Sequence, residues 1–98
     1  MTEVDDAKVK RAVLVSIDFN TPRFDEELDE FIQLVESTGL SPDIIIGGQR
    51  YKPDARFFIG KGKVAEISDF VQAHKPDLVI FNHELTPAQE RNLEKEIK

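Results

Sequence analysis

An almost unbroken apolar run near the start of this chain, Ala12–Ile17 (AVLVSI), limits what the chain can fold into more than any other feature. A strand that alternates apolar and polar residues keeps one face in water, whereas a continuous apolar strand has to be covered on both faces. Parallel strands that carry helices above and below the sheet provide such cover. We therefore expect residues 12–17 to form the central strand of a small α/β sheet.

Two further apolar segments predict two more strands. Asp43–Gly48 (DIIIGG) has the character of a second buried strand, and Asp77–Asn82 (DLVIFN) predicts a third. Between and after these strands, apolar residues recur at helical spacing. They predict a helix over residues 22–38, a second helix that begins just after Gly62, and a third over residues 87–98.

Capping residues indicate where these helices begin and end. Thr21, followed by Pro22, predicts the N-cap and first position of the first helix, and Gly39 predicts its end. Thr86 and Gln89 form the T-x-x-Q pattern of a capping box at the start of the third helix. With these boundaries, strands and helices alternate strictly along the chain.

Strict alternation implies parallel pairing with right-handed crossovers, which is the α/β class. With the most apolar strand in the middle, the sheet order is 2-1-3, with the first helix on one face and the other two on the opposite face. A doubly wound sheet would continue with a fourth strand, so we expect this chain to be part of a longer one. The open edge of the third strand is then free to pair with another copy. Residues 1–10 predict a flexible lead-in, and residues 11–98 a single α/β domain.

Composition limits the class of protein further. The chain has 98 residues, no cysteine and a net charge of −6, which predicts one small domain without disulfides or thiolate metal sites. The N-terminus has no targeting pattern, and no apolar run reaches the ~18 residues of a membrane span, so we expect a cytoplasmic protein. The acidic balance argues against a free-standing nucleic-acid binder, because phosphate neutralisation supplies most of the non-specific affinity of such proteins.

Positive charge is nevertheless concentrated in one segment, Arg50–Lys63 (RYKPDARFFIGKGK), which has five bases and one acid. Its glycine loop, GKGK over residues 60–63, opens the second predicted helix, where free N–H groups and the helix dipole attract phosphate. The loop matches neither G-x-x-x-x-G-K-[ST] nor G-x-G-x-x-G. A tight turn that needs a positive φ explains the same glycines. An anion site and a structural turn both stay open as interpretations.

A second candidate site lies where two predicted strands end. Asp18 follows the first strand, and Asn82, His83 and Glu84 follow the third. Adjacent parallel strands would bring these groups to the switch point where open α/β sheets bind ligands. There they could bind a divalent metal or carry out acid–base chemistry, or they could simply cap strands and helices in solvent.

Three segments of the chain resemble one protein family: RAVLVSIDF (Arg11–Phe19), RYKPDARFFIGKGKVAEI (Arg50–Ile67) and DLVIFNHELTPAQERNLEK (Asp77–Lys95). The last segment contains the pattern L-[ST]-P-x-Q-x-R-N-L-E, which Leu85–Glu94 match at every fixed position. On these segments the chain resembles the N-terminal domain of the HflX family of ribosome-associated GTPases. The resemblance implies an α/β subdomain, followed by a helical hairpin and a GTPase domain, in a protein that binds the large ribosomal subunit and helps to split or rescue ribosomes.

For this chain, the resemblance implies a binding module with no catalytic residue that can be assigned. The family's GTP-binding motifs are not in the sequence, so GTP and Mg²⁺ are expected only for the full-length protein, and no metal site is expected here. The alternative is an ATP or GTP site with a weak hydrolase or regulatory role, using Asp18, His83 and Glu84. The expected partners are the large ribosomal subunit, its rRNA and the GTPase domain of the same chain. The residues expected to contact rRNA are Arg50, Lys52, Arg56, Lys61 and Lys63 through their charge, Gly60 and Gly62 through close backbone approach, and Arg91 and Asn92 on the third helix.

Overall fold

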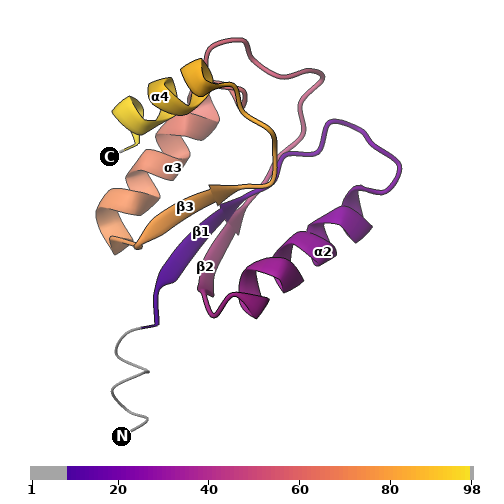
Figure 1. Cartoon of the computed structure of the whole chain (residues 1–98). Helices are drawn as coiled ribbons and strands as arrows, with labels where there is room; N and C mark the ends of the chain where they lie inside the picture. Colours follow the sequence, from indigo (N-terminus) through magenta and orange to yellow (C-terminus); the bar gives the residue numbers. More distant parts are fainter. Residues whose placement is uncertain (1–8, 98) are drawn as a thin grey trace, which may run out of the picture.

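Strand β1 (Arg11–Val15) occupies the middle of a parallel sheet, between β2 (Ser41–Ile46) and β3 (Leu78–Phe81) (Figure 1). The order β2-β1-β3 confirms the 2-1-3 order predicted from the sequence. The computed structural model describes residues 9–97. Most of the predicted lead-in, residues 1–8, therefore lies outside the described part of the chain.

Helices cover both faces of this sheet. Helix α2 (Phe24–Ser37) packs on one face, and α3 (Lys61–His74) and α4 (Pro87–Glu96) pack on the other (Figure 1). The α/β class and the predicted division of the helices between the two faces are confirmed. Within the described residues, no helix combines the length and the apolar character that a membrane crossing requires.

Successive side chains of β1 enter two separate apolar cores. Every residue from Ala12 to Val15 is 0% exposed. Because alternate side chains of a strand point to opposite faces of the sheet, this strand supplies both cores, which explains its unbroken apolar sequence. The core under α2 contains Ala12, Leu14, Phe31 and Val35, and the larger core under α3 and α4 includes Val13, Val15, Ile46, Ile59, Ile67 and Leu93.

The prediction that the second strand is buried is wrong. Ile44 and Ile45 are 37% and 41% exposed, and only Ile46 is buried, at 2%. The strand lies at an edge of the sheet, where neither helical layer closes fully over its side chains. Its apolar sequence therefore indicated a strand correctly but did not reveal its edge position.

The predicted starts of the first two helices are also wrong. Helix α2 begins at Phe24 without a side-chain cap hydrogen bond, because Thr21 and Pro22 lie in a separate turn that the Phe24 N–H closes on the Thr21 carbonyl (3.3 Å). Helix α3 begins at Lys61, so that Gly62 lies inside the first turn of the helix and not before it.

Two other boundaries are confirmed. Gly39 ends α2 with a φ of +91°, a conformation that glycine adopts without strain. At the start of α4, Thr86 Oγ1 accepts the Gln89 N–H (3.1 Å), and Gln89 Oε1 accepts the Thr86 N–H (3.0 Å). The predicted capping box is therefore present in full.

Arg11 closes the amino end of the sheet. Its guanidinium donates to the Asp43 carboxylate and to the carbonyl oxygens of His74 and Lys75, each at 2.7 Å, and its backbone N–H donates to Asp77 (2.7 Å). The two carbonyls belong to the C-terminal end of α3, where the helix dipole favours a cation. Structural hydrogen bonds therefore hold the amino end of the sheet together.

In the described residues, the outer edge of β3 pairs with no other strand, and a groove of about 700 Å³ runs beside it along α4. Since an open edge presents unpaired N–H and C=O groups, we expect this edge to pair with β3 of a second copy. Light scattering should show a dimer that dissociates on dilution. A strict monomer at high concentration would contradict this expectation.

Candidate nucleic-acid interface

The loops at the carboxyl ends of the strands are hydrogen-bonded to one another. The Asp18 N–H donates to the Gly48 carbonyl (2.7 Å), and the Asp18 carbonyl accepts the Arg50 N–H (3.0 Å). The Ile17 N–H donates to His83 Nε2 (2.9 Å). One bonded platform results, made of the first loop (residues 16–23), the second loop (47–60) and the third loop (82–86).

His83 joins the first and third loops as a neutral acceptor. Because its Nε2 accepts the Ile17 N–H, its ring proton lies on Nδ1. The imidazole centroid lies 5.5 Å from the Phe19 ring centroid and 5.0 Å from that of Phe58. Burial lowers the pKa of His83 below its ordinary value of about 6.5. His83 thus has a structural role in linking the loops.

Asp18 and Glu84, the other members of the alternative site predicted from the sequence, do not converge on His83 as a ligand set. Asp18 Oδ1 accepts the Asn20 N–H (2.7 Å), and Oδ2 accepts a side-chain N–H of Gln49 (3.3 Å). Glu84 is exposed. Across residues 9–97, no group of three or more His, Cys, Asp or Glu side chains is arranged to hold a metal ion. A nucleotide or metal role for these residues stays a prediction from the sequence.

Asp54 organises a tight turn inside the second loop. Asp54 and Phe58 exchange both backbone hydrogen bonds (2.9 Å each), and Asp54 Oδ2 accepts the N–H groups of Phe57 (2.8 Å) and Arg56 (3.0 Å). The hydrogen bond from the Phe57 N–H is the main cause that lowers the pKa of the Asp54 carboxyl below its ordinary value. The Arg56 N–H and the nearby guanidiniums of Arg50 and Arg56 also lower this pKa. Asp54 is therefore an ionised carboxylate that the loop itself uses.

Helix α4 holds this turn in place. The side-chain amide of Gln89 donates to the carbonyls of Asp54 and Ala55 (3.2 Å each), while its oxygen completes the capping box. Asn92 donates to the carbonyl of Arg56 (3.1 Å). Since Gln89 is only 9% exposed, its amide satisfies its hydrogen-bonding capacity inside the protein. Asn92 therefore helps to position the loop that carries the cations, and its predicted contact with rRNA stays a prediction.

Sequence reasoning missed this second role of Gln89. The capping-box pattern found Gln89, but its bond to the second loop joins residues 35 positions apart, and no local spacing reports such a contact. The turn at Asp54 could have been predicted from the sequence, because aspartate commonly accepts backbone N–H groups in turns.

Two of the predicted cations have partners within the protein. Lys63 pairs with Glu66 one helical turn away (2.8 Å). The Nε of Arg50 donates to the Lys52 carbonyl (3.3 Å), and its guanidinium lies against Gly60. These two side chains contribute positive charge to the surface but are held in position.

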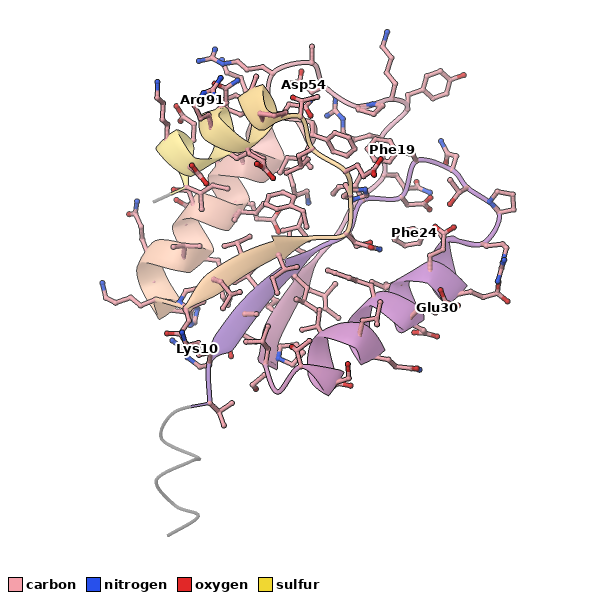
Figure 2. The ribbon with its side chains drawn as sticks, viewed as in Figure 1. Lys10, Phe19, Phe24, Glu30, Asp54 and Arg91 are labelled. Carbon is pink, nitrogen blue, oxygen red and sulfur yellow. The ribbon has the colours of Figure 1, made fainter. Side chains whose placement is uncertain are left out.

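The other predicted cations are exposed. Lys52, Arg56, Lys61 and Arg91 form no ion pair among the described residues. The Arg56 guanidinium carbon lies 5.1 Å from the ring centroid of buried Phe57, and Arg56 and Lys61 line one cleft of about 530 Å³ formed by the second loop, α3 and α4. Figure 2 shows Arg91 and Asp54 at the same end of the molecule, opposite Lys10.

The start of α3 adds to the positive charge at this end. The first N–H groups of a helix lack intrahelical partners and carry the positive end of its dipole. Helix α3 has no acidic residue in its first turn, whereas α2 has three. Gly60 has φ +86° and ψ 154°, and a Cβ there would collide with Arg50 Nη1, but a Cβ on Gly62 would meet open space. Gly60 thus provides the structural turn, and Gly62 lies in an exposed helix start.

A match to a known protein family places the chain in a class. The sequence model of the family described as "GTP-binding GTPase N-terminal" matches residues 25–98. The chain is therefore an α/β N-terminal domain of a GTP-binding GTPase.

Curated relatives define the family more closely. The GTPase HflX of Escherichia coli is 44% identical over 86 residues, which cover 88% of this chain and 20% of that protein. The GTPase HflX of Caldanaerobacter subterraneus subsp. tengcongensis is 38% identical over 85 residues (87% and 20%), and that of Alkalihalophilus pseudofirmus is 33% identical over 100 residues (98% and 23%). The chain belongs to the HflX family and corresponds to its N-terminal domain, as its three segments predicted. It spans about a fifth of the length of these relatives.

The hydrogen bonds of Gln89 predict that this side chain matters for stability. The substitution Gln89→Leu nearly keeps the volume but leaves the Ala55 carbonyl and the Thr86 N–H without their partner, and it removes the second hydrogen bond of the Asp54 carbonyl, which also accepts the Phe58 N–H. We expect the free energy of unfolding to fall by about 1–3 kcal/mol. Urea denaturation would measure the change, with exposed Glu94→Leu on the same helix as the matched control, expected to change stability by about 0.5 kcal/mol or less. If both variants lose the same free energy of unfolding, the hydrogen bonds of Gln89 to the second loop do not stabilise the domain.

The lowered pKa of His83 predicts a pH-dependent stability. As pH falls below about 6.5, the unfolded chain protonates His83 while the folded chain resists it, so the free energy of unfolding should decrease. The contribution is present above the unfolded pKa and is lost as pH falls. Denaturation between about pH 5.5 and 7.5 should show this slope in the wild type and in His74→Gln, but not in His83→Gln. A slope that survives in His83→Gln would assign the effect to other groups.

Proposed function

We propose that this chain is a ribosome-binding module, through which an HflX-family GTPase docks on the rRNA of the large ribosomal subunit and helps to split or rescue ribosomes. The observation that carries the proposal is the gathering of exposed cations at one end of an acidic domain. Lys52, Arg56 and Lys61 lie there beside a helix start that has no acid in its first turn. Family membership supports the same conclusion.

Each part of this end has a role in binding a phosphate backbone. The exposed cations neutralise phosphates, which supplies most of the sequence-independent affinity for nucleic acid. The exposed start of α3 at Gly62 lets phosphate oxygens approach backbone N–H groups. The acids Asp25, Glu26 and Glu27 at the start of α2 repel RNA from that face of the domain. The uneven distribution of charge therefore orients the domain, and the net charge of −6 does not prevent docking.

The GTP and Mg²⁺ chemistry of the full-length protein is assigned to a GTPase domain in the same polypeptide, acting in the cytoplasm. The residues of this chain do not fit that chemistry. The glycine loop lacks the P-loop spacing, and the described residues contain no acidic or histidine cluster for a metal. The role of this domain is therefore to place its neighbour on the subunit.

Charge reversal tests the proposed RNA contact. In Lys52→Glu/Lys61→Glu, binding to purified large ribosomal subunits should weaken. The slope of log affinity against log salt should flatten by about 1.4–1.8, because each of the two lost phosphate contacts removes ~0.7–0.9 of slope. Co-sedimentation of the chain with large subunits over a series of salt concentrations measures both quantities.

The matched control changes the charge equally at the opposite end. Lys10 precedes β1 and Lys75 caps the C-terminus of α3, so Lys10→Glu/Lys75→Glu alters the net charge by the same amount away from the loops. It should retain most of the affinity and the full salt slope. If both double variants lose affinity alike, binding reflects net charge alone and the assignment to this interface fails.

A further inference from the structure

Tyr51 is an exposed aromatic side chain that the fold does not use. It is 93% exposed, the highest value among the large hydrophobic residues of the described chain. Its ring belongs to neither apolar core and to none of the close ring pairs found in residues 9–97. A tyrosine ring in water forgoes the burial that aromatic residues normally contribute. Packing within the domain therefore does not explain the position of Tyr51.

The loop holds Tyr51 between two fixed points. On one side, the Arg50 N–H donates to the Asp18 carbonyl (3.0 Å), and the Arg50 Nε reaches across to the Lys52 carbonyl (3.3 Å). On the other side, Asp54 is paired with Phe58, and its carbonyl is bonded to α4. Only three residues separate Arg50 from Asp54, and one of them is a proline. The ring is thus presented on a short, anchored span, which lowers the entropy that binding would cost.

The neighbours of Tyr51 are cationic and not apolar. Arg50 and Lys52 flank it in sequence, and Arg56 lies in the same loop. The other exposed large hydrophobic residues lie outside the second loop: Val9 precedes β1, Leu34 is on α2, and Ile44 and Ile45 are on β2. The core of a protein–protein interface would be expected to bring several apolar residues together and to avoid lysine. A single ring among cations instead matches the way proteins bind single-stranded nucleic acid, with bases stacked on aromatic side chains and phosphates on lysine and arginine.

We infer that Tyr51 is a stacking platform for an unpaired RNA base, so that the second loop recognises a single-stranded or looped segment of rRNA and not a continuous duplex. This inference rests on the proposed function and adds the local structure of its partner. A paired base cannot offer its face to the ring, whereas a splayed base can stack on Tyr51 while its phosphates contact the flanking cations.

The composition of the chain makes this inference directly measurable. Tyr51 is the only tyrosine and there is no tryptophan, so the intrinsic tyrosine emission of the chain comes from this ring alone. A single-stranded oligoribonucleotide of about ten nucleotides should quench this emission saturably, and a duplex of equal length should bind more weakly and leave it nearly unchanged.

Three variants of Tyr51 distinguish base stacking from nonspecific binding of RNA. Tyr51→Phe keeps a ring and should retain binding within about twofold, whereas Tyr51→Ala should lose about 5- to 150-fold, the equivalent of one stacked base. Tyr51→Leu keeps an apolar side chain without a π face and should behave like Tyr51→Ala. The salt slope should stay unchanged in all three, because no phosphate contact is removed. Circular dichroism of each variant verifies that the domain is folded.

The outcomes distinguish this inference from the proposed function. If Tyr51→Ala binds single-stranded RNA and large subunits like the wild type while Lys52→Glu/Lys61→Glu does not, the stacking role is wrong and the RNA contact stands. If Tyr51→Leu binds as well as Tyr51→Phe, or duplex RNA quenches as strongly as single strands, stacking is also wrong. If the tyrosine emission responds only to isolated large-subunit proteins and not to RNA, the partner of Tyr51 is a protein and the stacking role is wrong. If the wild type binds neither RNA nor large subunits, both proposals fail.

Discussion

The whole domain depends on the burial of β1 on both faces. Each residue from Ala12 to Val15 is fully buried, and the two cores on either side draw their other members from α2 on one face and from α3 and α4 on the other. A strand covered in this way cannot stay in the sheet unless both helical layers are present. At roughly 25 cal/mol per Å² of apolar surface, burial of four such side chains is a major share of the stability of so small a domain. Substitutions there would unfold the site together with the core.

The same strand also positions the loops of the candidate interface. Directly after β1, the N–H groups of successive residues are donated to different partners: Ser16 to Ile46, Ile17 to His83, and Asp18 to Gly48. The segment that leaves the core thus connects the ends of both neighbouring strands. Helix α4 then fixes the far side of the second loop through its side-chain amides. Cations on this loop are presented by an ordered scaffold, which reduces the cost of ordering them when a ligand binds.

Local patterns in the sequence predicted the elements, the strand order and the capping box at Thr86, because these depend on periodicity and on contacts within one turn. They did not predict that Ile45 is partly exposed, since the edge position of β2 follows from how far the helices reach over the sheet. They also placed Gly62 in a turn, whereas of the two glycines in residues 60–63 only Gly60 has a positive φ. For the candidate site, the sequence located the cations but not the hydrogen bonds of Gln89 to the second loop, because these join distant parts of the chain. The ion pair of Lys63 with Glu66 is different, because residues three apart on a helix are neighbours and their spacing could have indicated the pair.

We propose that the loops at the carboxyl ends of the strands, and the start of α3 that follows them, form the surface that meets the large ribosomal subunit. Hydrogen-exchange mass spectrometry of this chain, with and without large subunits, tests that claim most directly. We expect slower exchange in residues 48–64, with no change in α2 or at the opposite end around Arg11 and Lys75. Protection confined to α2 or to the Arg11 end, or no protection at subunit concentrations that saturate binding, would contradict it.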